Sequence, residues 1–338
     1  MTNSLKGCHK AAFYCLNTNY KDLTHLFQNP NTIHMKQRFL NTIFVSCCIT
    51  LAIGFTACND DNYYFKTEKT DYSNSPNANK NDTTGNADLA RLEFPKVKGG
   101  RSIVVTHRTG DMYGINYSLE WDCEKKSQRW SCYQMYSGNS GGNVGRYDTQ
   151  TNGYPQDPNI PSADRFQFDP YWGSGYDHGH ICPSADRQYS YEANMQTFYI
   201  SNMQPQRNIF NAGVWADMEG QLRKKWNTNK FRDRLYVAKG GTIDNTMQTL
   251  GTTSSGLIIP RYFFMAILCE YDNGQYKALG FWIEHKNSDQ SRDLSQYVVN
   301  IDRLEELTGI DFFCNLPDEV EDKVESTSRS QVLKDWDF

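Results

Sequence analysis

The sequence has no excess of positive charge. Lysine and arginine contribute 35 residues and aspartate and glutamate 39, so the formal net charge is −4. This balance argues against a protein that holds nucleic acid by bulk electrostatic attraction, because such binding neutralises many phosphates with lysine and arginine. It leaves room for an enzyme that contacts phosphates locally and then releases them.

The sequence also lacks a Cys-x-x-Cys pair and any internal repeat. Without a Cys-x-x-Cys pair, a structural zinc ribbon is a poor interpretation. Of the 10 cysteines, five lie at or before Cys58 and five follow it. Five is an odd number, so at least one of the later thiols stays free or pairs outside the chain. Cys123 and Cys132 flank a short polar stretch and could form a disulfide across a hairpin.

One apolar run near the N-terminus is shorter than a typical membrane span. A basic start at 35–38 precedes an apolar run at 39–55, which ends in Thr56-Ala57-Cys58. This is the pattern of a secretory signal, and the cysteine directly after Thr-Ala resembles a bacterial lipobox. A transmembrane helix is the alternative, which the shortness of the run disfavours. We therefore expect residues 35–58 to be a lipoprotein signal peptide. A lipid on Cys58 would hold the exported protein at the cell envelope, in the outer membrane, facing the periplasm or the cell surface.

Polar segments flank the part of the chain that we expect to fold. Residues 1–34 precede a complete signal, so we interpret them as an upstream extension and Met35 as the true start. Residues 59–93 are poor in apolar side chains and rich in Asn, Asp, Thr, Ser and Lys, which is typical of a flexible tether. Residues 319–338 form a polar tail that we expect to be frayed. Residues 94–318 then form one domain of ordinary size.

Strand patterns outnumber helix patterns in this domain. Runs of β-branched and aromatic residues predict strands at 102–108, 113–121, 129–136, 197–202, 234–240, 257–271 and 276–285. The clearest helix is expected at 211–226, where apolar residues recur at every fourth position. A shorter helix is expected at 302–309, with Asp302 as its N-cap and Gly309 as its stop. Many strands without regularly alternating helices predict an α+β domain around an antiparallel sheet.

Two histidines stand one residue apart in a loop-like context, in the stretch Asp177–His180. This stretch resembles the DRGH motif of the DNA/RNA non-specific endonucleases, the ββα-metal nucleases. Residues 201–223 resemble the second block of that family, with Asn, Pro-Gln, a second Asn before a helix containing Trp, and then Glu and Arg. Residues 231–241 and 307–317 resemble its C-terminal part. The resemblance implies a single catalytic domain with a central antiparallel β-sheet flanked by helices, here in a bacterial lipoprotein form.

Phosphodiester hydrolysis needs a deprotonated water, a cation near the leaving oxygen and positive charge around the transition state. His180 is the candidate general base, because an imidazole with an ordinary pKa of about 6.5 can accept a proton near neutrality. The resemblance implies one Mg²⁺, with Mn²⁺ as a substitute, held by the carbonyl group of Asn211 and several waters. Such ligation suits an ion that keeps much of its hydration shell. The alternative is that Asn211 simply caps the helix that follows it.

The resemblance gives supporting roles to other polar residues near this helix. Glu219 would orient water beside the metal, and Arg223 would contact phosphate; helical spacing places both on a polar border shared with the metal ligand. The alternative is a surface Glu–Arg pair one helical turn apart. Asn202, Gln206 and Asp177 are expected as supporting groups near the metal and phosphate. Buried hydrogen bonding to a turn accounts equally well for Asn202.

Two further site positions carry open questions. Arg146 falls where the family has an arginine upstream of the motif, and it is the candidate phosphate contact across the cleft. Arg165 is its rival, because the alignment crosses a variable loop. His178 stands where the family pattern has Arg. Arginine is permanently charged and binds phosphate through paired donors, whereas histidine is charged only when protonated. We therefore expect weaker or more pH-dependent transition-state stabilisation, or a neutral, structural His178.

These features predict a metal-dependent, sugar-non-specific endonuclease. It would hydrolyse DNA and RNA, single or double stranded, through contacts to the backbone rather than to base edges. The alternative is a catalytically weak or inactive envelope lipoprotein that binds nucleic acid or a partner; His178 supports it, and the pI of about 6.0 opposes it. A transition-metal store at His178 and His180 has least support, since no further His or Cys ligands lie nearby. Beyond nucleic acid and the membrane bound through Cys58, a second copy of the chain in a homodimer is a candidate partner.

Overall fold

The computed structural model describes residue 72 and residues 74–338. The expected upstream extension at 1–34, the signal peptide at 35–58 and the lipidated Cys58 lie outside these residues. Within the described part of the chain, no helix has both the length and the apolar character that crossing a membrane requires.

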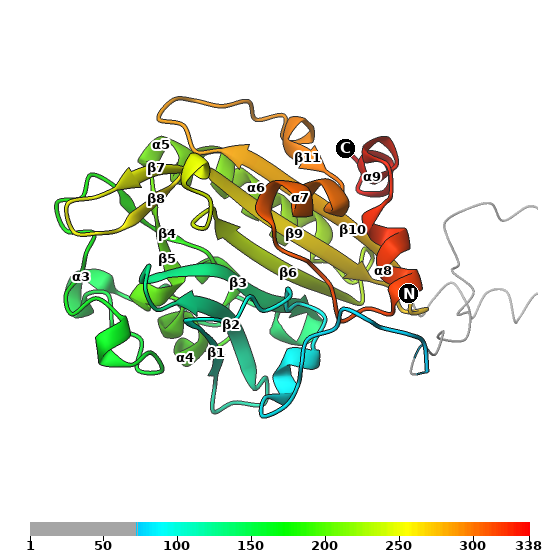
Figure 1. Ribbon diagram of the computed structural model, residues 1–338, viewed down its shortest axis with the longest axis horizontal. Coiled ribbons are helices and arrows are strands. Elements are labelled where there is room, and N and C mark those ends of the chain that lie inside the picture. Colours follow the sequence, from blue (N-terminus) through cyan, green and yellow to red (C-terminus); the bar gives the residue numbers. More distant parts are fainter. Residues whose placement is uncertain (1–71, 73) are drawn as a thin grey trace, which may run out of the picture. The chain divides into compact units, whose positions relative to one another are not determined.

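An antiparallel sheet occupies the centre of the domain (Figure 1). Among the described residues it has seven strands in the order β1-β2-β3-β6-β9-β10-β11, and every neighbouring pair is antiparallel. The strands are β1 (Ser102–Arg108), β2 (Ile115–Asp122), β3 (Ser127–Tyr136), β6 (Arg234–Gly241), β9 (Tyr262–Glu270), β10 (Tyr276–Glu284) and β11 (Val298–Val299). The predicted α+β fold with a central antiparallel sheet is confirmed.

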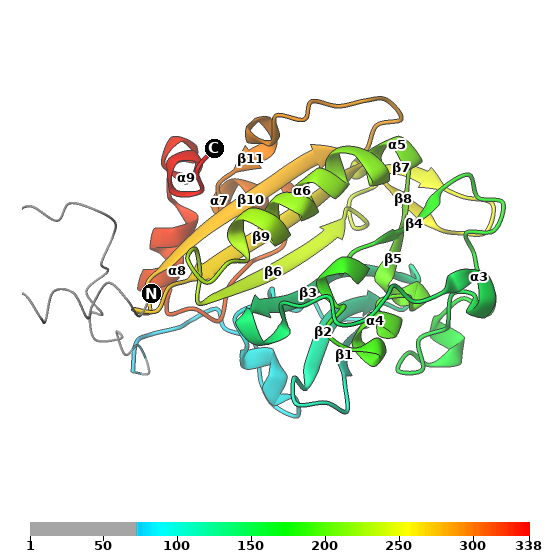
Figure 2. The same ribbon diagram turned by 180° about the vertical axis from the view of Figure 1, so that it is seen from behind.

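The sheet separates the core into two layers, because side chains alternate between the two faces of each strand. In β9, all residues from Phe263 to Glu270 are buried, which accounts for the continuous apolar run in the sequence. One layer contains Phe263, Met265, Ile267 and Cys269, and the other contains Phe264, Ala266 and Leu268. Helix α7 (Ile301–Thr308) covers one face in Figure 1, and helix α6 (Ala216–Gln221) covers the other in Figure 2.

The helix predicted at 211–226 is confirmed, but it begins three residues earlier. It runs from α5 (Asn208–Phe210) through α6, and wider π-type turns occupy Asn211–Trp215 and Leu222–Trp226. Gly213 departs from helical geometry, with φ −100° and ψ −119°, and kinks the helix. The apolar stripe is buried in the core layer on this face and consists of Val214, Trp215, Met218, Leu222 and Trp226.

The paired histidines lie in a strand rather than in the expected loop. Strand β4 (Asp177–His180) pairs antiparallel with β5 (Met203–Gln206), and Gly179 stands opposite Gln204. A Cβ atom at Gly179 would lie 2.3 Å from Cγ of Gln206 and 2.6 Å from the backbone oxygen of Gln204. Only glycine allows the two strands to pack this closely, so the glycine of the motif sets the position of both histidines.

Two other strand predictions need correction. Residues 197–202 follow helix α4 (Tyr191–Gln196) and form a turn and a short 3-10 helix (Ile200–Asn202) instead of a strand. Side-chain hydrogen bonds from Thr197 and Asn202 to nearby backbone carbonyls hold this turn. The strand predicted at 257–271 is interrupted at Arg261, which separates β8 (Ile258–Pro260) from β9. Two further short elements are α3 (Thr149–Asn152) and β7 (Thr249–Thr252), which pairs with β8.

Helix α7 confirms the predicted stop but not the predicted start. Gly309 adopts the left-handed conformation, with φ 70°, and ends the helix. The N-cap is Asn300 rather than Asp302, since the Asn300 side chain accepts a hydrogen bond from the N–H of Arg303. Asp302 therefore lies in the first helical turn, where its side chain is available for other contacts.

The described part of the expected tether is packed against the domain rather than flexible. Asn81 is 4% exposed; its amide donates to the carbonyl of Pro95 at 3.1 Å and accepts from the N–H of Val97 at 2.9 Å. Asn77 donates to the carbonyl of Cys314 at 3.1 Å. Composition suggested a tether because these segments contain few apolar residues. Asparagine side chains can instead fix such a segment by hydrogen bonding to backbone groups.

The expected frayed tail is part of the core. Residues 319–338 contribute to helices α8 (Asp318–Glu325) and α9 (Arg329–Asp335). Trp336 is fully buried, donates to the carbonyl of Ala278 at 3.2 Å and accepts from the indole N–H of Trp226 at 3.2 Å. A few well-placed apolar residues outweigh the polar average of this segment, so the folded part extends beyond the predicted 94–318 at both ends.

The suggested Cys123–Cys132 disulfide is wrong. Both cysteines are free and buried, as are the other three cysteines in the described part of the chain. Cys123 belongs to the core layer of helix α6, and Cys132 belongs to the layer on the opposite face of the sheet. The sheet itself therefore keeps the two thiols apart.

Candidate active site

An open pocket of about 450 Å³ lies where β4 meets the kinked helix that contains α6. Tyr154, Tyr176, Pro183, Ser184, Ala185 and Ala216 form part of its lining. Six residues that the sequence singled out complete it: Arg146, Asp177, His178, His180, Asn211 and Glu219. The fold therefore brings most of the predicted site together from segments that are distant in the sequence.

His180 has the properties of a neutral base. Burial, together with the charges of Arg146 and His178, lowers the pKa of its imidazole to about 3, so the ring is uncharged near neutrality. Its Nε2 atom is buried and has no hydrogen-bond partner within the described residues. In the tautomer that carries its hydrogen on Nδ1, the lone pair of Nε2 is available to accept a proton.

Asn211 presents an oxygen atom from within the helix. Its amide nitrogen donates to Oδ2 of Asp177 at 3.0 Å, and the amide of Asn208 donates to the same oxygen at 3.0 Å. Because the carboxylate can only accept, the nitrogen of the Asn211 amide faces Asp177 and its carbonyl oxygen faces away. The backbone N–H of Asn211 bonds to the carbonyl of Arg207, so the residue is not the helix N-cap and that alternative is wrong.

The oxygen donors in this pocket suit a hard divalent cation. The carbonyl oxygen of Asn211 and the carboxylate of Glu219 both line it. Neutral and anionic oxygens are the ligands that Mg²⁺ and Mn²⁺ accept in proteins. The residues present therefore fit an ion that is bound through few protein atoms and keeps several waters.

Glu219 forms an ion pair with a lysine that the sequence did not single out. Nζ of Lys239, on β6, lies 2.5 Å from Oε1 of Glu219 and 4.8 Å from the ring centre of Trp215. Burial raises the pKa of Glu219 and Asp186 adds to the rise, whereas Lys239 opposes it; the net shift is upward. Lys239 is fully buried. A lysine directly after the buried run Leu235–Ala238 of β6 was the available signal for this residue.

Arg223 lies beside the pocket rather than in it. Its guanidinium pairs with Oδ1 of the buried Asp186, whose Oδ2 accepts a hydrogen bond from the hydroxyl of Tyr133 at 3.0 Å. Arg223 lines a neighbouring hollow with Asn139 and Asn227. Its expected contact with phosphate remains a prediction.

Arg146 is the arginine that faces the pocket. It is exposed, and its guanidinium lies 4.6 Å from the ring centre of Phe198. Across residues 74–338 we find no ion pair for Arg146, so its charge is available to an anion. The rival Arg165 lies outside the pocket and donates to the carbonyl of Asp157.

His178 is held on several sides. Its ring stacks between Tyr154, with ring centres 3.6 Å apart, and Tyr171, with ring centres 4.3 Å apart. Its Nε2 lies 3.0 Å from both carboxylate oxygens of Asp169. Burial alone would raise the pKa of the Asp169 carboxyl, but hydrogen bonds from His178 and from the N–H of Tyr171 lower it below its ordinary value. One ring nitrogen of His178 is therefore committed to Asp169, a residue that the sequence did not identify.

Asn202 and Gln206 lie behind the pocket. Asn202 is fully buried; it donates to the carbonyls of Cys182 and Thr197 at 2.9 and 2.8 Å and accepts from the N–H of Cys182 at 2.9 Å. Hydrogen bonding to a turn therefore accounts for Asn202, and it anchors the chain just after His180. Gln206 is fully buried against Gly179, and neither polar atom of its amide has a partner within the described residues.

Comparisons with known proteins bear on this site. The sequence model of a family described as DNA/RNA non-specific endonuclease matches residues 105–319. Nuclease C1 of Cunninghamella echinulata var. echinulata is 32% identical over 171 residues, which cover 48% of this chain and 67% of that protein. The mitochondrial nuclease EXOG of Xenopus laevis is 30% identical over 214 residues, covering 60% and 58% respectively. A nuclease of a Nostoc species is 29% identical over 220 residues, covering 62% and 75%.

These matches therefore span between 58% and 75% of the relatives' own lengths. Among solved structures, a chain in the crystal structure of the EndoG/EndoGI complex matches with a TM-score of 0.54 at 21% identity. The match covers 66% of this chain and 91% of that one. At this identity the likeness concerns the fold.

Proposed function

Because the chain belongs to the DNA/RNA non-specific endonuclease family, we propose that it hydrolyses phosphodiester bonds of DNA and RNA in the pocket between β4 and α6. One observation carries the proposal. The unpartnered Nε2 of His180, the exposed guanidinium of Arg146 and the free amide oxygen of Asn211 line the same pocket. A proton acceptor, an anion-binding group and a cation ligand are the parts that phosphodiester hydrolysis requires.

Arg146 binds the phosphate. Its guanidinium is exposed and lies against Phe198, so the side chain is positioned without being neutralised. The contact is to the backbone of the nucleic acid, which carries no sequence information. The absence of a basic excess in the chain fits an enzyme that binds substrate locally and releases product.

His180 removes the proton from the attacking water. In the free protein its pKa is about 3, so it is a weak base. An anionic phosphate entering the pocket favours the protonated imidazole and raises its proton affinity. Nε2 has no hydrogen-bond partner within the described residues, so the tautomer with its hydrogen on Nδ1 leaves Nε2 as the acceptor. The base therefore becomes effective when substrate is bound.

We propose Mg²⁺, with Mn²⁺ as a substitute, as the divalent cation held by the amide oxygen of Asn211; when bound, it stabilises negative charge on the phosphate and on the leaving oxygen. Asp177 fixes the orientation of the Asn211 amide. Glu219 orients water at the pocket wall, and Lys239 compensates its charge. The guanidinium of Arg223 is paired with Asp186 beside the pocket. From that position it acts on the negative charge of the phosphate.

We also propose that lipid on Cys58 holds the protein at the cell envelope, as the pattern of residues 35–58 suggests. A Cys58→Ala variant should move from the membrane fraction to the soluble fraction of the cell. Retention of that variant in the membrane fraction would contradict this assignment.

The test of the enzymatic proposal is incubation of the purified full chain with plasmid DNA and with RNA, with Mg²⁺, with Mn²⁺ and with EDTA. Cleavage should require the metal. His180→Ala should reduce the rate by about 10²–10⁴-fold, the usual contribution of a general base. Arg146→Ala should also reduce it strongly, whereas the matched Arg165→Ala should not.

Melting temperatures of the variants should show that all of them are folded. Full activity of His180→Ala would refute the mechanism. Metal-independent binding of nucleic acid without cleavage, by the unaltered chain, would favour the alternative of an inactive binding protein.

A further inference from the structure

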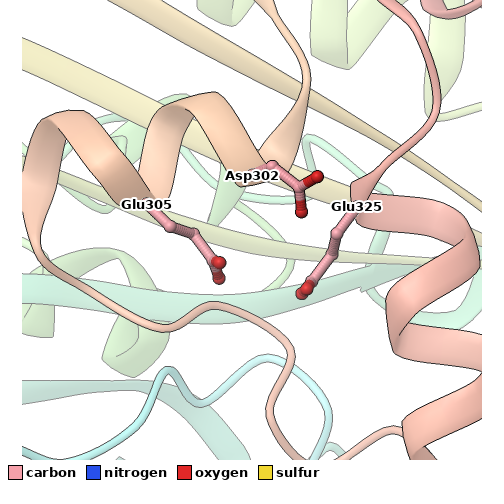
Figure 3. Close-up of side chains that lie close together, drawn as sticks. All are labelled: Asp302, Glu305 and Glu325. Atoms are coloured by element: carbon pink, nitrogen blue, oxygen red, sulfur yellow. The ribbon is translucent and has the colours of Figure 1, made fainter.

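Three carboxylates gather on the face of the sheet opposite the pocket (Figure 3). Asp302 and Glu305 project from α7, and Glu325 projects from the end of α8. Their nearest oxygen atoms all lie within 4.8 Å of one another. Both helices pack into the core layer that does not contain the pocket helix, through Ile301, Leu304, Val320 and Val324.

Glu325 is the most unusual member of this cluster. It is 7% exposed, and its Oε1 atom is buried without a hydrogen-bond partner within the described residues. Figure 3 shows its carboxyl group directed toward Asp302 and Glu305. A buried carboxylate without a partner is costly, so folded proteins pair such groups or use them to bind a metal.

Within the described residues, no basic side chain forms an ion pair with the cluster. Of the ion pairs formed in residues 74–338, none involves Asp302, Glu305 or Glu325. Glu305 accepts one hydrogen bond, from the N–H of Phe312 at 2.7 Å. Lys96 lies in the region, but its ammonium donates to backbone carbonyls, at 2.5 and 2.7 Å.

Two more acidic residues, Asp311 and Glu321, lie near the three clustered carboxylates. The amide of Asn79 donates to Glu321 at 2.8 Å and to Asp311 at 3.3 Å. The cluster is therefore flanked by two further carboxyl groups, each held by the Asn79 amide rather than by a basic side chain.

We propose that Asp302, Glu305 and Glu325 bind one Ca²⁺ ion that joins α7 to α8. The donors are all carboxylate oxygens, which hard cations prefer. Oxygens bound to one Ca²⁺ at about 2.3–2.6 Å can lie at most about 5 Å apart, and the observed cluster fits this limit. Calcium also accepts irregular geometry, whereas Mg²⁺ demands a near-ideal octahedron. The site is separate from the cation ligand Asn211 and does not depend on the proposed nuclease activity.

The ion would stabilise the C-terminal part of the fold. Helix α8 leads into α9 and then to Trp336, which bonds to the end of the pocket helix through Trp226. An ion that binds only the folded chain raises the free energy of unfolding. Ca²⁺ would therefore supply the positive charge that the cluster lacks and stabilise the position of α8.

The test uses the full chain, stripped of metal with EDTA and then titrated with Ca²⁺ while melting temperature and heat of binding are measured. The Asn211→Ala background removes the cation ligand of the pocket. In that background we expect one Ca²⁺ per chain and a rise in melting temperature. Glu325→Gln should abolish the rise and weaken binding by at least about tenfold, because ligand charge sets calcium affinity.

Glu319→Gln is the matched control, since Glu319 lies exposed on the same helix. It should respond to Ca²⁺ as the parent does. Asp302→Asn, at an exposed position, replaces Glu325→Gln if that variant does not fold, and it should also weaken binding. The proposal is overturned if the Asn211→Ala protein shows no calcium response, or if Glu325→Gln or its replacement responds as strongly as Glu319→Gln. An equal rise with equimolar Mg²⁺ would overturn the choice of calcium.

Discussion

Carboxylates on the two sides of the sheet have different surroundings. On the pocket side, Glu219 has Lys239, Asp186 has Arg223 and Asp169 has His178. On the opposite side, Asp302, Glu305 and Glu325 have no such partner within the described residues. Internal partners fix groups that must keep their positions while a substrate enters and leaves. Missing partners around the buried Glu325 indicate a ligand that comes from outside the chain.

The largest effect is expected when a carboxylate on the pocket side loses its charged partner. Lys239→Met would leave the largely buried Glu219 without its cation, which costs up to about 3–5 kcal/mol. Urea unfolding should show the loss, and cleavage activity should fall with it because Glu219 no longer keeps its position. Adding Glu219→Gln to Lys239→Met should recover most of the stability.

The matched control for that variant is Arg303→Met, which breaks the exposed pair with Glu306. Exposed pairs contribute roughly 0–1 kcal/mol, so this change should be nearly silent. A Lys239→Met protein as stable as the Arg303→Met protein would show that the pocket pair is not the compensated pair that we describe.

A second comparison adds a methyl group on each side of the sheet and leaves the charges unchanged. A Cβ at Gly179 would meet Gln206 and the β5 backbone on the pocket side. A Cβ at Gly280 would lie 3.0 Å from Val299 and 3.2 Å from Leu304 of α7 on the other side. Each alanine variant should lose about 1–3 kcal/mol through overpacking. Only Gly179→Ala should also lose cleavage activity, because it displaces the strand that carries both histidines.

Gly220→Ala is the control for this pair, since no atom lies within 4 Å of a Cβ added there. It should leave activity intact and stabilise the helix by about 0.5–1 kcal/mol. Equal loss of activity in the Gly179 and Gly280 variants would contradict the separation of the two sides.

The smallest expected effect concerns His178. Asp169→Asn replaces a partly exposed partner, so we expect a stability change of only about 0.5–1 kcal/mol. The rate should change with pH differently from the parent, because the charge facing His178 is gone. An unchanged pH–rate profile would mean that His178 has no electrostatic role in cleavage and serves to position β4.

The sequence was most informative where local pattern and contact coincide. The strands β1, β3, β6 and β10 follow from β-branched and aromatic runs, and the pocket helix follows from its apolar spacing. Five of the six predicted residues that line the pocket lie in motif blocks, whereas Arg146 was predicted across a variable loop. Asn202 shows the limit of that reasoning. Its place in the second motif block suggested a role in the site, but its four hydrogen bonds are those of a buried structural amide.

The sequence could not predict contacts between residues that lie far apart along the chain. Lys239 reaches Glu219 across 20 residues, and nothing in the spacing indicates the pair. Asp169 and the tyrosines around His178 come from loops without a motif. The segment 74–93 and the tail at 319–338 looked unstructured because average polarity does not show which few side chains become buried. Glu325 lies within that tail, so its burial was hidden for the same reason.

The two-layered core has a consequence for how this protein can change over time. The pocket helix and the helices of the acidic cluster pack into different layers, separated by the backbone of β6, β9 and β10. Substitutions in one layer therefore have few shared neighbours with those in the other, and their effects on stability should add. Selection for robustness can act on the cluster face while selection for turnover acts on the pocket face. The sheet makes thermal tolerance and catalysis separately adjustable traits of a single domain.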